Sequence, residues 1–542
     1  MFTVTVLASW GEKTHRYTHS VRLHEALSDM GLSLFLPCGG HGTCGKCIVR
    51  VQGAVSAPSP EEKQQLSAFE LSQGYRLACQ TEATGDCMVY YTTSQAALQG
   101  VSFGHMQKIR LDPIGAPSAR CGMAVDIGTT TVAAALFDLT NGQCISALCR
   151  QNPQAAYGLD VISRIDAALQ GKISVMQRAI AATISDMAEQ LLSSARPADV
   201  QGGAADSTAQ RGSMSCPAHA GRSDSVASQT QQKAGAHEPP DITCTLPIDV
   251  CVITGNTTML YLLCGYEPHD LAAAPFNAQH LFGTWKGGTY LMPCISAFVG
   301  ADITAAIVSS GLTDHGAALL CDIGTNGEIA LWDGSDLYCC ATAAGPAFEG
   351  AKISMGGIAC EGAIDHVYTG PDNTISYTTV GGKAATHICG SGLIDAVAAM
   401  LSLGVIDETG YLADRYQIGT SGVFIEPQDI REVQLAKSAI RSGMDTLLCE
   451  RSCSYDSLSH LYLAGGFGQY LAPQRAAAIG LIAPQLAQKC VPTGNSALAG
   501  AAMVLLDKGC QARCEAIARQ AHICHLHNNT HFSRLFMENM LF

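Results

Sequence analysis

Alternating apolar and polar residues open the chain. MFTVTVLASW at 1–10 has the period of two that is typical of a β-strand, and residues 3–20 together predict a hairpin. The next stretch, VRLHEALSDMGL at 21–32, has the helical period of an amphipathic α-helix. CMVYYT at 87–92 predicts one more strand. The first ninety residues therefore predict a small unit of strands with one helix against them.

Further along, two hydropathy patterns each occur twice. VDIGTTTVAAALFDLTNG at 125–142 and CDIGTNGEIALWDGSD at 321–336 both run apolar strand, Asp, Gly-containing turn with hydroxyl residues, second apolar strand and Asp. VCVITGNTTMLYLLCG at 250–265 and LYLAGGFGQYLAPQRAAAIG at 461–480 both run strand, Gly turn and helix. Repetition within a chain indicates duplicated architecture, so these segments predict two related lobes.

Two stretches lack any period. Residues 193–240 are small and polar, which predicts a disordered surface insertion at about 200–240. Residues 94–120 predict a linker. The 542-residue length allows three or four domains. We therefore expect a first domain at 1–93, the linker at 94–120, a first lobe at 121–310 and a second lobe with a C-terminal tail at 311–542.

Composition narrows the class of protein. Hydrophobic residues make up 47% of the chain, yet no apolar run approaches the ~20 residues that a membrane helix needs. The net charge of -14, without a cluster of Lys and Arg, disfavours nucleic-acid binding. The 24 cysteines are scattered, and the N-terminal stretch lacks a basic leader. These features predict a cytoplasmic protein whose thiols are mostly reduced.

Cysteines gather in LPCGGHGTCGKCIV at 36–49. Cys38, Cys44 and Cys47 follow a C-x5-C-x2-C spacing, and Cys79 lies 32 positions beyond Cys47. Four thiolates are what a 2Fe-2S cluster requires, and the intervening glycines allow a tight loop that directs N–H groups at the sulfurs. The plant-type spacing for such a cluster, C-x4-C-x2-C, has a first gap one residue shorter.

Two alternatives to this assignment stay open from the spacing alone. Zinc sites usually take two close cysteine pairs, and only one such pair occurs here, which favours the iron–sulfur cluster. Cys87 could replace Cys79 as the fourth ligand. The segment RLACQ around Cys79 resembles the corresponding segment of 2Fe-2S ferredoxins, as does the order of hairpin, helix and closing strand. That resemblance implies a β-grasp fold and the ligands Cys38, Cys44, Cys47 and Cys79.

The repeated turns have the chemistry of an anion site. Each offers backbone N–H groups and Thr hydroxyls to an anion, and the Asp at the end of each first strand, Asp126 or Asp322, can hold hydrated Mg²⁺. Two such turns that face one another would grip one triphosphate from both sides. The chain has no G-x-x-x-x-G-K-[ST] P-loop.

The order of these repeats resembles the superfamily of acetate and sugar kinases, Hsp70 chaperones and actin. The fold expected is thus a multidomain α+β and α/β protein: a β-grasp ferredoxin domain, a linker and two ribonuclease-H-like lobes. The resemblance implies that ATP and Mg²⁺ bind at the two aspartates, which are the catalytic candidates. It also implies phosphate-binding and adenosine-binding residues: Gly128, Thr129, Thr130, Gly324, Thr325, Asn326, Gly465, Gly466 and Gly468.

Other polar residues have no assigned role at this level. Asp302 and Glu328 could position the hydrolytic water, or could equally be surface or hinge carboxylates. Phe348 and Glu349 in AGPAFEGA could border the nucleotide or the partner, but they fit a turn better. The tail, with CEAIARQAHI at 514–523 and an apolar end, predicts packed helices and not a metal site.

An electron carrier joined to an ATPase suggests an acceptor whose potential lies below that of the cluster. Plant-type clusters lie near about -400 mV, and each 100 mV uphill costs one electron about 2.3 kcal/mol. A difference of that order between the potentials of the cluster and the acceptor is small enough to be overcome by a conformational change in which two lobes close on ATP.

The whole arrangement resembles the reductive activators of corrinoid proteins. The motifs that carry this resemblance are NPQAAYGLDVISRI at 152–165, ITGNTTM at 253–259, DIGTNGEIAL, ICGSGLID at 388–395, LAGGFG at 463–468 and FMENMLF at 536–542. It implies ATP-dependent return of Co(II) corrinoid to Co(I) for methyl transfer. Its implied partners are the corrinoid protein of a methyltransferase system, an upstream reductase or ferredoxin as electron donor, and a second copy in a homodimer.

Two other functions fit parts of the same pattern. The first keeps ATP-driven electron transfer but serves another low-potential enzyme. The second is a redox-responsive, chaperone-like binding protein, which would deliver no electrons. Mixing the reduced protein with Co(II) corrinoid protein, with and without MgATP, separates the three functions.

Overall fold

The N-terminal unit is a single mixed sheet with short helices against it. In this computed structural model its elements are β1 (Phe2–Ala8), β2 (Gly11–Tyr17), β3 (Val21–Arg22), α1 (Leu23–Asp29), β4 (Ile48–Val55), α2 (Pro60–Gln65), α3 (Ala68–Ser72), β5 (Tyr75–Leu77) and β6 (Glu82–Tyr90). The sheet order is β2-β1-β6-β4-β5, with β1 parallel to β6. The predicted hairpin and helix are confirmed, and the predicted closing strand begins earlier, at Glu82.

The structure describes most of the chain. The described residues are 1–8, 11–30, 32, 40, 42, 47–90, 106–158, 160–194, 248–370, 372–468 and 470–542. The predicted insertion at 200–240, the first part of the predicted linker and the end of the predicted strand at 91–92 lie outside them.

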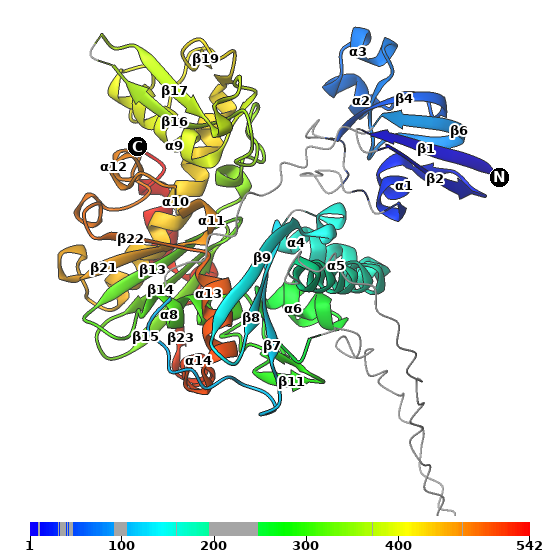
Figure 1. The fold of residues 1–542 in the computed structure, drawn as a ribbon. Coiled ribbons are helices and arrows are strands. Elements are labelled where there is room, and N and C mark those ends of the chain that lie inside the picture. Colours follow the sequence, from blue (N-terminus) through cyan, green and yellow to red (C-terminus); the bar gives the residue numbers. More distant parts are fainter. Residues whose placement is uncertain are drawn as a thin grey trace, which may run out of the picture.

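Two larger sheets follow, and five strands of each have the same order and directions (Figure 1). The first sheet adds β11 beside β12, and the second adds β23 at the opposite edge, beside β15. The first has the order β11-β12-β10-β7-β8-β9, and the second β22-β21-β13-β14-β15-β23. In each, the first two strands of the hairpin are antiparallel and the first strand is parallel to the strand that precedes a Gly turn. The first-sheet strands are β7 (Cys121–Ile127), β8 (Thr131–Asp138), β9 (Gln143–Gln151), β10 (Val250–Gly255), β11 (Thr284–Lys286) and β12 (Thr289–Leu291). The second-sheet strands are β13 (Ala318–Ile323), β14 (Gly327–Trp332), β15 (Leu337–Thr342), β21 (His460–Ala464), β22 (Cys490–Gly494) and β23 (His522–Ile523).

The duplication predicted from hydropathy is therefore confirmed. We call residues 121–310 the first repeat and residues 318–506 the second repeat. Each ends on an apolar helix after its last parallel strand: α8 (Ala301–Ser310) and α13 (Ser496–Leu506).

These two helices form one layer between the sheets. α13 packs along α8 and also contacts β7 and β10 of the first sheet, while α8 contacts β14 of the second. One buried core accordingly runs from Val125 and Ile253, through Ile307 and Leu505, to Leu320. The last helix of the second repeat therefore belongs to the core of the first, which the division into lobes at residue 310 did not anticipate.

Helices cover the outer faces of both sheets. On the first sheet these are α5 (Ile173–Ser194) and α6 (Thr257–Cys264), and on the second α10 (Pro427–Glu450). α9 (Gly390–Ser402) packs instead against β16 of a separate three-stranded sheet. The remaining elements are η1 (Pro153–Tyr157), α4 (Val161–Ala167), η2 (Ala168–Lys172), α7 (His269–Ala272), η3 (Pro346–Glu349), β16 (Ala363–Thr369), β17 (Ile375–Thr379), η4 (Val380–Gly382), β18 (His387–Ile388), β19 (Tyr416–Gln417), β20 (Phe424–Ile425), η5 (Tyr455–Ser457), α11 (Gly465–Gly468), α12 (Pro473–Ala478), η6 (Pro484–Leu486), α14 (Lys508–Gln520), η7 (Leu526–Asn528) and α15 (Thr530–Glu538).

Residues 106–120 differ from the free tether that the sequence predicts. They form no helix or named strand, but the Asp112 N–H donates to the Leu506 carbonyl at 2.9 Å and Ile114 is 2% exposed. Ile114 packs into the core that surrounds α13. Burial of one apolar side chain contributes about 1.5–3 kcal/mol, so this part of the segment is anchored to the repeats.

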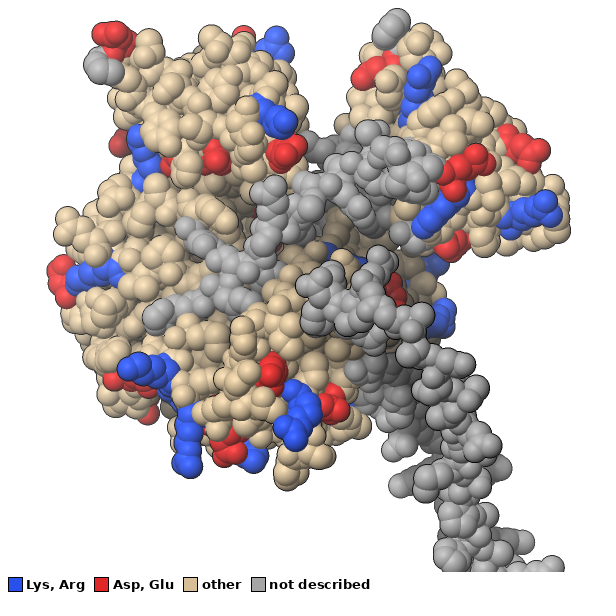
Figure 2. Space-filling model, in the orientation of Figure 1, with Lys and Arg blue, Asp and Glu red and all other residues tan. Residues whose placement is uncertain are grey.

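The C-terminal tail packs as helices, as its apolar pattern predicts. α15 lies against α10, where Ser438 donates to the Phe536 carbonyl and Gln434 donates to the Met540 carbonyl at 2.8 Å. In the part of the chain that the structure describes, no helix is both long and apolar enough to cross a membrane. On the face drawn in Figure 2, the described Lys and Arg side chains are interspersed with Asp and Glu.

Candidate functional site

Two of the four predicted cluster cysteines lie together beneath the surface of the N-terminal unit. The Cys47 and Cys79 sulfurs are 3.3 Å apart, and the two residues are 1% and 0% exposed. The Ala78 N–H donates to the Cys47 carbonyl at 2.9 Å, which fixes the Cys79 turn against the start of β4. Cys38 and Cys44 lie outside the described residues. The pair that the structure describes fits a thiolate-ligated cluster, because both sulfurs can reach one iron.

Gln80 ties this turn to the glycine-rich loop. Its Nε2 donates to the Gly40 carbonyl at 2.6 Å and lies 3.6 Å from the Cys79 sulfur. Gly40 has φ +87°, a conformation that favours glycine. Cys87, the alternative fourth ligand, lies instead in the middle of β6, paired with Val4. The geometry therefore favours Cys79 over Cys87.

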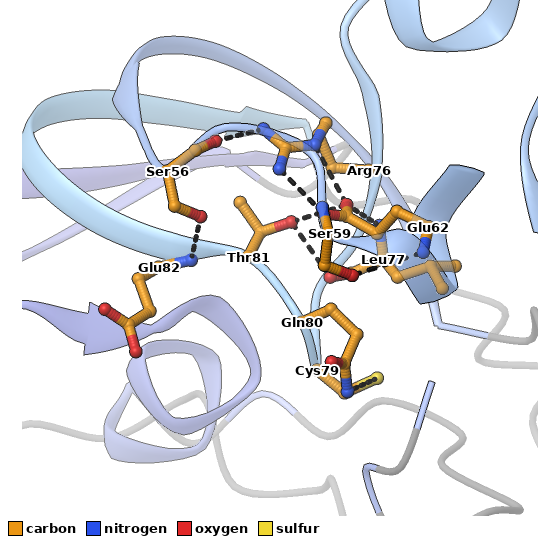
Figure 3. A network of polar contacts seen from close by, with 9 residues as sticks. All are labelled: Ser56, Ser59, Glu62, Arg76, Leu77, Cys79, Gln80, Thr81 and Glu82. Atoms are coloured by element: carbon orange, nitrogen blue, oxygen red, sulfur yellow. Dashed lines mark hydrogen bonds and ion pairs between the residues drawn. The ribbon is translucent and has the colours of Figure 1, made fainter. Parts of the chain in front are cut away.

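A buried ion pair holds the other side of the Cys79 turn (Figure 3). Arg76 binds Glu62 through two nitrogens, Nε at 2.9 Å and Nη2 at 2.8 Å, and Glu62 is 0% exposed. The carboxylate also accepts from the Leu77 N–H at 3.0 Å and the Thr81 hydroxyl at 2.9 Å. Burial raises the pKa of Glu62, but the hydrogen bonds from Arg76, the Ser59 and Leu77 N–H groups and Thr81 together outweigh it and lower the pKa.

Glu62→Gln is expected to loosen the turn that carries Cys79. The change leaves the Arg76 guanidinium buried without a carboxylate, which costs about 3–5 kcal/mol. Hydrogen exchange over residues 75–81 should become faster, while the exposed-site control Glu12→Gln should leave it unchanged. Unchanged exchange in Glu62→Gln would show that the pair does not hold the turn.

The same pair predicts a pH dependence. Because the folded-state pKa of Glu62 is lowered, its stabilisation is complete above the ordinary Glu pKa and is lost as pH falls through the lower folded value. The protection factors of residues 75–81 in the wild type, which compare the observed exchange with the intrinsic rate at each pH, should therefore fall in that acidic window.

A second cluster of candidate side chains lies where the two repeats meet. Asp126 ends β7 beside Thr254 of β10, and Asp322 ends β13 beside Ala464 of β21. Asn495, the residue before α13, donates to the Asp126 carboxylate at 3.1 Å and so links the second repeat to the first. The two predicted aspartates thus occupy equivalent positions and face one shared site.

Two further carboxylates converge on this site. Glu328 on β14 is paired with Asp322 across the hairpin and accepts a 3.4 Å hydrogen bond from Asn256 of the first repeat. Asp302 lies in the first turn of α8. Neither residue is a surface carboxylate, because Glu328 is 7% exposed and Asp302 is half-buried.

Burial and like charges act together on the pKa values of these carboxylates. Burial raises the pKa of Asp126, Asp302 and Asp322 to about 7 each, with like charges acting in the same direction: Asp322 on Asp126, Asp126 on Asp302, and Asp302 on Asp322. Burial also raises the pKa of Glu328. Such crowding of carboxylates favours a bound cation. Among the described residues, no group of three or more potential ligands is arranged closely enough to enclose a metal ion.

Asn152 and Arg164 hold the first turn from behind. The Asn152 N–H donates to the Thr130 carbonyl at 2.9 Å and its Nδ2 to the Gly128 carbonyl at 2.8 Å. Arg164 donates to the Thr129 carbonyl. The carbonyls of residues 128–130 therefore all accept hydrogen bonds from Asn152 or Arg164. The Thr130 hydroxyl points the other way and donates to the second repeat.

Glycines bring the second turn, α11 and α9 together. Gly465 has φ +86°, and a Cβ there would lie 2.6 Å from the Asp322 carboxylate. A Cβ at Gly390 would lie 2.0 Å from the Phe348 carbonyl and 2.7 Å from the Phe467 ring. Phe348 and Phe467 stack with ring centroids 5.5 Å apart. The LAGGFG, CGSG and GPAFEG segments thus meet at one place, and Gly466 faces open space.

The structure brings most of the described candidates to one of two places. Asp126, Gly128, Thr129 and Thr130 lie on the first-repeat side of the second place, and Asp322, Gly324, Thr325, Asn326, Gly465 and Gly466 lie on the other side. Gly468 packs against Leu463 of β21. Sequence reasoning missed Asn152, Arg164, Asn495 and Glu349 as parts of this site. The first two lie in NPQAAYGLDVISRI, a segment that the sequence analysis quoted without a role for either residue.

The fold and the two sites define a class of protein: an ASKHA-fold chain, the superfamily of sugar kinases, Hsp70 and actin, with a ferredoxin-type iron–sulfur domain at its N-terminal side. Residues 316–542 match the family "C-terminal domain of RACo the ASKHA domain", and residues 121–202 and 245–315 match "RACo middle region". Residues 13–84 match "2Fe-2S iron-sulfur cluster binding domain". The chain belongs to the family of corrinoid activation enzymes, the reductive activators of corrinoid proteins.

Similar proteins carry this assignment. The chain is 31% identical over 465 residues to the corrinoid activation enzyme RamQ of Eubacterium limosum, covering 78% of this chain and 70% of RamQ. It is 30% identical over 304 residues to a [Co(II) methylated amine-specific corrinoid protein] reductase of Methanosarcina barkeri, covering 48% of this chain and 56% of that protein. The solved structure of a reductive activator for corrinoid,iron-sulfur protein covers 100% of this chain and 98% of its own, with 26% identity and a TM-score of 0.64.

Proposed function

We propose that this protein uses ATP to drive one electron from its 2Fe-2S cluster to a Co(II) corrinoid protein, which regenerates Co(I) for methyl transfer. The observation that carries the proposal is the alignment with RamQ, which spans 78% of this chain. The ferredoxin-type domain at 13–84 and the ASKHA repeats in one chain supply the two parts that the reaction needs.

The cluster supplies one electron at a low potential when it is bound. In this proposal Cys38, Cys44, Cys47 and Cys79 hold it. Glu62, Arg76 and Gln80 keep the Cys79 turn in place, because their hydrogen bonds fix the backbone on both sides of that residue. The electron leaves the reduced cluster, Co(II) gains it and becomes Co(I), and an upstream reductase or ferredoxin restores the reduced cluster.

The cleft between the repeats would bind the nucleotide. The turns at 128–130 and 324–326 offer N–H groups and hydroxyls to the phosphates, and Gly465, Gly466 and Gly468 leave room for the nucleoside. Asp126 and Asp322 would hold hydrated Mg²⁺, since hard oxygen ligands suit that ion. Hydrogen bonds between the repeats, such as Asn256 to Glu328, give closure and opening a direct connection to the state of this site.

The proposal also includes domain and assembly assignments. The domains are 1–93, a linker at 94–120, 121–310 and 311–542. We also propose that the protein forms a homodimer and is located in the cytoplasm.

The test is an anaerobic assay with the reduced holoprotein and a Co(II) corrinoid protein. With MgATP, the absorption of Co(I) corrinoid should appear and that of Co(II) should decay. Without nucleotide, or with MgADP, the Co(II) spectrum should persist. Absence of Co(I) with MgATP, while the cluster is reduced and ATP is hydrolysed, would contradict this acceptor and favour another low-potential partner.

A further inference from the structure

Glu349 lies between the two turns that the proposed function assigns to phosphate. Its Oε2 accepts a 2.6 Å hydrogen bond from the Thr130 hydroxyl of the first repeat, and its Oε1 accepts a 3.0 Å hydrogen bond from the Thr325 hydroxyl of the second. One carboxylate therefore receives a hydroxyl from each wall of the cleft. Both hydroxyls belong to the repeated turns, although Thr325 aligns with Thr129 and Thr130 aligns with Asn326.

Packing holds Glu349 in this position. The preceding Phe348 is 2% exposed and stacks on Phe467 of α11. The following Gly350 has φ +77°, and a Cβ there would lie 2.4 Å from the Gly357 backbone nitrogen. The backbone at residues 348–350 is thus fixed on both sides, and the half-buried Glu349 side chain extends toward the turns.

This carboxylate lies near one buried cation, Arg164, and near one carboxylate, Asp322, whose pKa its charge helps to raise. Arg164 is 0% exposed, and its hydrogen bonds go to the Gly158 and Thr129 carbonyls and to the Met259 sulfur, none of them charged. Burial lowers the pKa of Arg164 to about 9, and the charges of Asp160 and Glu349 oppose that shift. A buried guanidinium is expensive unless an anion is close. Glu349 is one of the two carboxylates that act on it.

We propose that Glu349 occupies the position of the nucleotide's terminal phosphate and serves as the chain's own placeholder, linking the two repeats until a phosphate displaces it. This inference rests on the proposed nucleotide function and adds to it how the site is kept when no nucleotide is bound. A phosphate that accepts from Thr130 and Thr325 cannot share their hydroxyls with a carboxylate, and the two anions repel one another. Arrival of the phosphate therefore breaks the Thr130–Glu349 link across the cleft.

Small apolar residues beside Glu349 show that the contact lies at the meeting point of the repeats. Ala155 of η1 and Ala351 pack together and are 3% and 2% exposed. Loss of the Thr130–Glu349 hydrogen bond would remove one of the links between the repeats beside this contact. Nucleotide binding would thus alter a contact between repeats directly, without a longer chain of coupled side chains.

The experiment measures binding to the anaerobic holoprotein by calorimetry, with the non-hydrolysable analogue MgAMPPNP as probe. Glu349→Ala should bind it about tenfold more tightly than the wild type, because the phosphate no longer competes with two charge-assisted hydrogen bonds. Glu349→Gln should fall between the two, since the amide keeps one acceptor and loses the charge. The exposed control Glu361→Ala should match the wild type.

A second pair of probes separates phosphate competition from a general effect on the cleft. Inorganic tripolyphosphate should show the same gain in Glu349→Ala, whereas adenosine should bind the wild type and the variant equally. Equal or weaker MgAMPPNP binding in Glu349→Ala would overturn the placeholder role. Failure of the wild type and every variant to bind any adenine nucleotide would instead refute the proposed function itself.

Discussion

Cys79→Ala is expected to abolish the visible absorption of the 2Fe-2S cluster and, with it, all electron delivery. The Cys79 sulfur is buried and lies 3.3 Å from that of Cys47, so its loss removes one of the paired thiolates that hold the metal. Anaerobic reconstitution followed by iron analysis and absorption spectroscopy measures this. ATP hydrolysis should persist, because the second site lies in other parts of the fold.

Cys87→Ala is the matched control for that experiment. Cys87 is also buried, but its place in the middle of β6 is structural, and burial raises the pKa of its thiol to about 11, with the charge of Asp86 in the same direction. The variant should keep its iron and its spectrum. If Cys87→Ala loses the cluster and Cys79→Ala retains it, the ligand assignment is wrong.

Asp322→Asn is expected to lower ATP hydrolysis by at least a factor of about one hundred, which corresponds to about 2.7 kcal/mol in activation free energy. Asparagine keeps the shape of the side chain against Gly465 but removes the charge that would hold Mg²⁺. Phosphate release under anaerobic conditions measures the rate. The iron content and cluster spectrum should be those of the wild type.

Asp336→Asn provides the control, because Asp336 lies in the same hairpin region but is exposed, directly before the start of β15. Its ATPase rate should not change. Full hydrolysis by Asp322→Asn would remove Asp322 from the nucleotide site and leave Asp126, Asp302 and Glu328 as the candidates there. Retained affinity for MgAMPPNP in Asp322→Asn would show that the loss concerns hydrolysis and not folding of the cleft.

Local pattern was enough to predict most of the elements. The period of two in 3–20 and the helical period in 21–32 gave the hairpin and α1, because each reflects which side chains of one short segment face the core. The paired strand–turn–strand segments likewise predicted two sheets of like topology. Boundaries were less accurate, as for β6, because the ends of a strand depend on its neighbours in the sheet.

Such local patterns could not predict how segments far apart in the sequence pack together. α13 reads as the end of the second repeat, yet it packs on β7 and β10 of the first. Residues 106–120 read as a tether, yet Ile114 enters the same core. In both cases the apolar side chains could be buried against any apolar surface. Only the assembled fold determines which surface they pack against.

The sequence by itself determined the two kinds of chemistry, because cysteine spacing and repeated Asp–Gly–Thr turns are local requirements of a cluster and of a phosphate site. It also indicated the family, because the family's motifs occur in order along the chain. Only the tertiary structure decided that Arg164, Asn495 and Glu349 belong with those turns. They come from segments far apart in the chain, and a buried charge acquires its role from the neighbours that folding brings within a few ångströms of it.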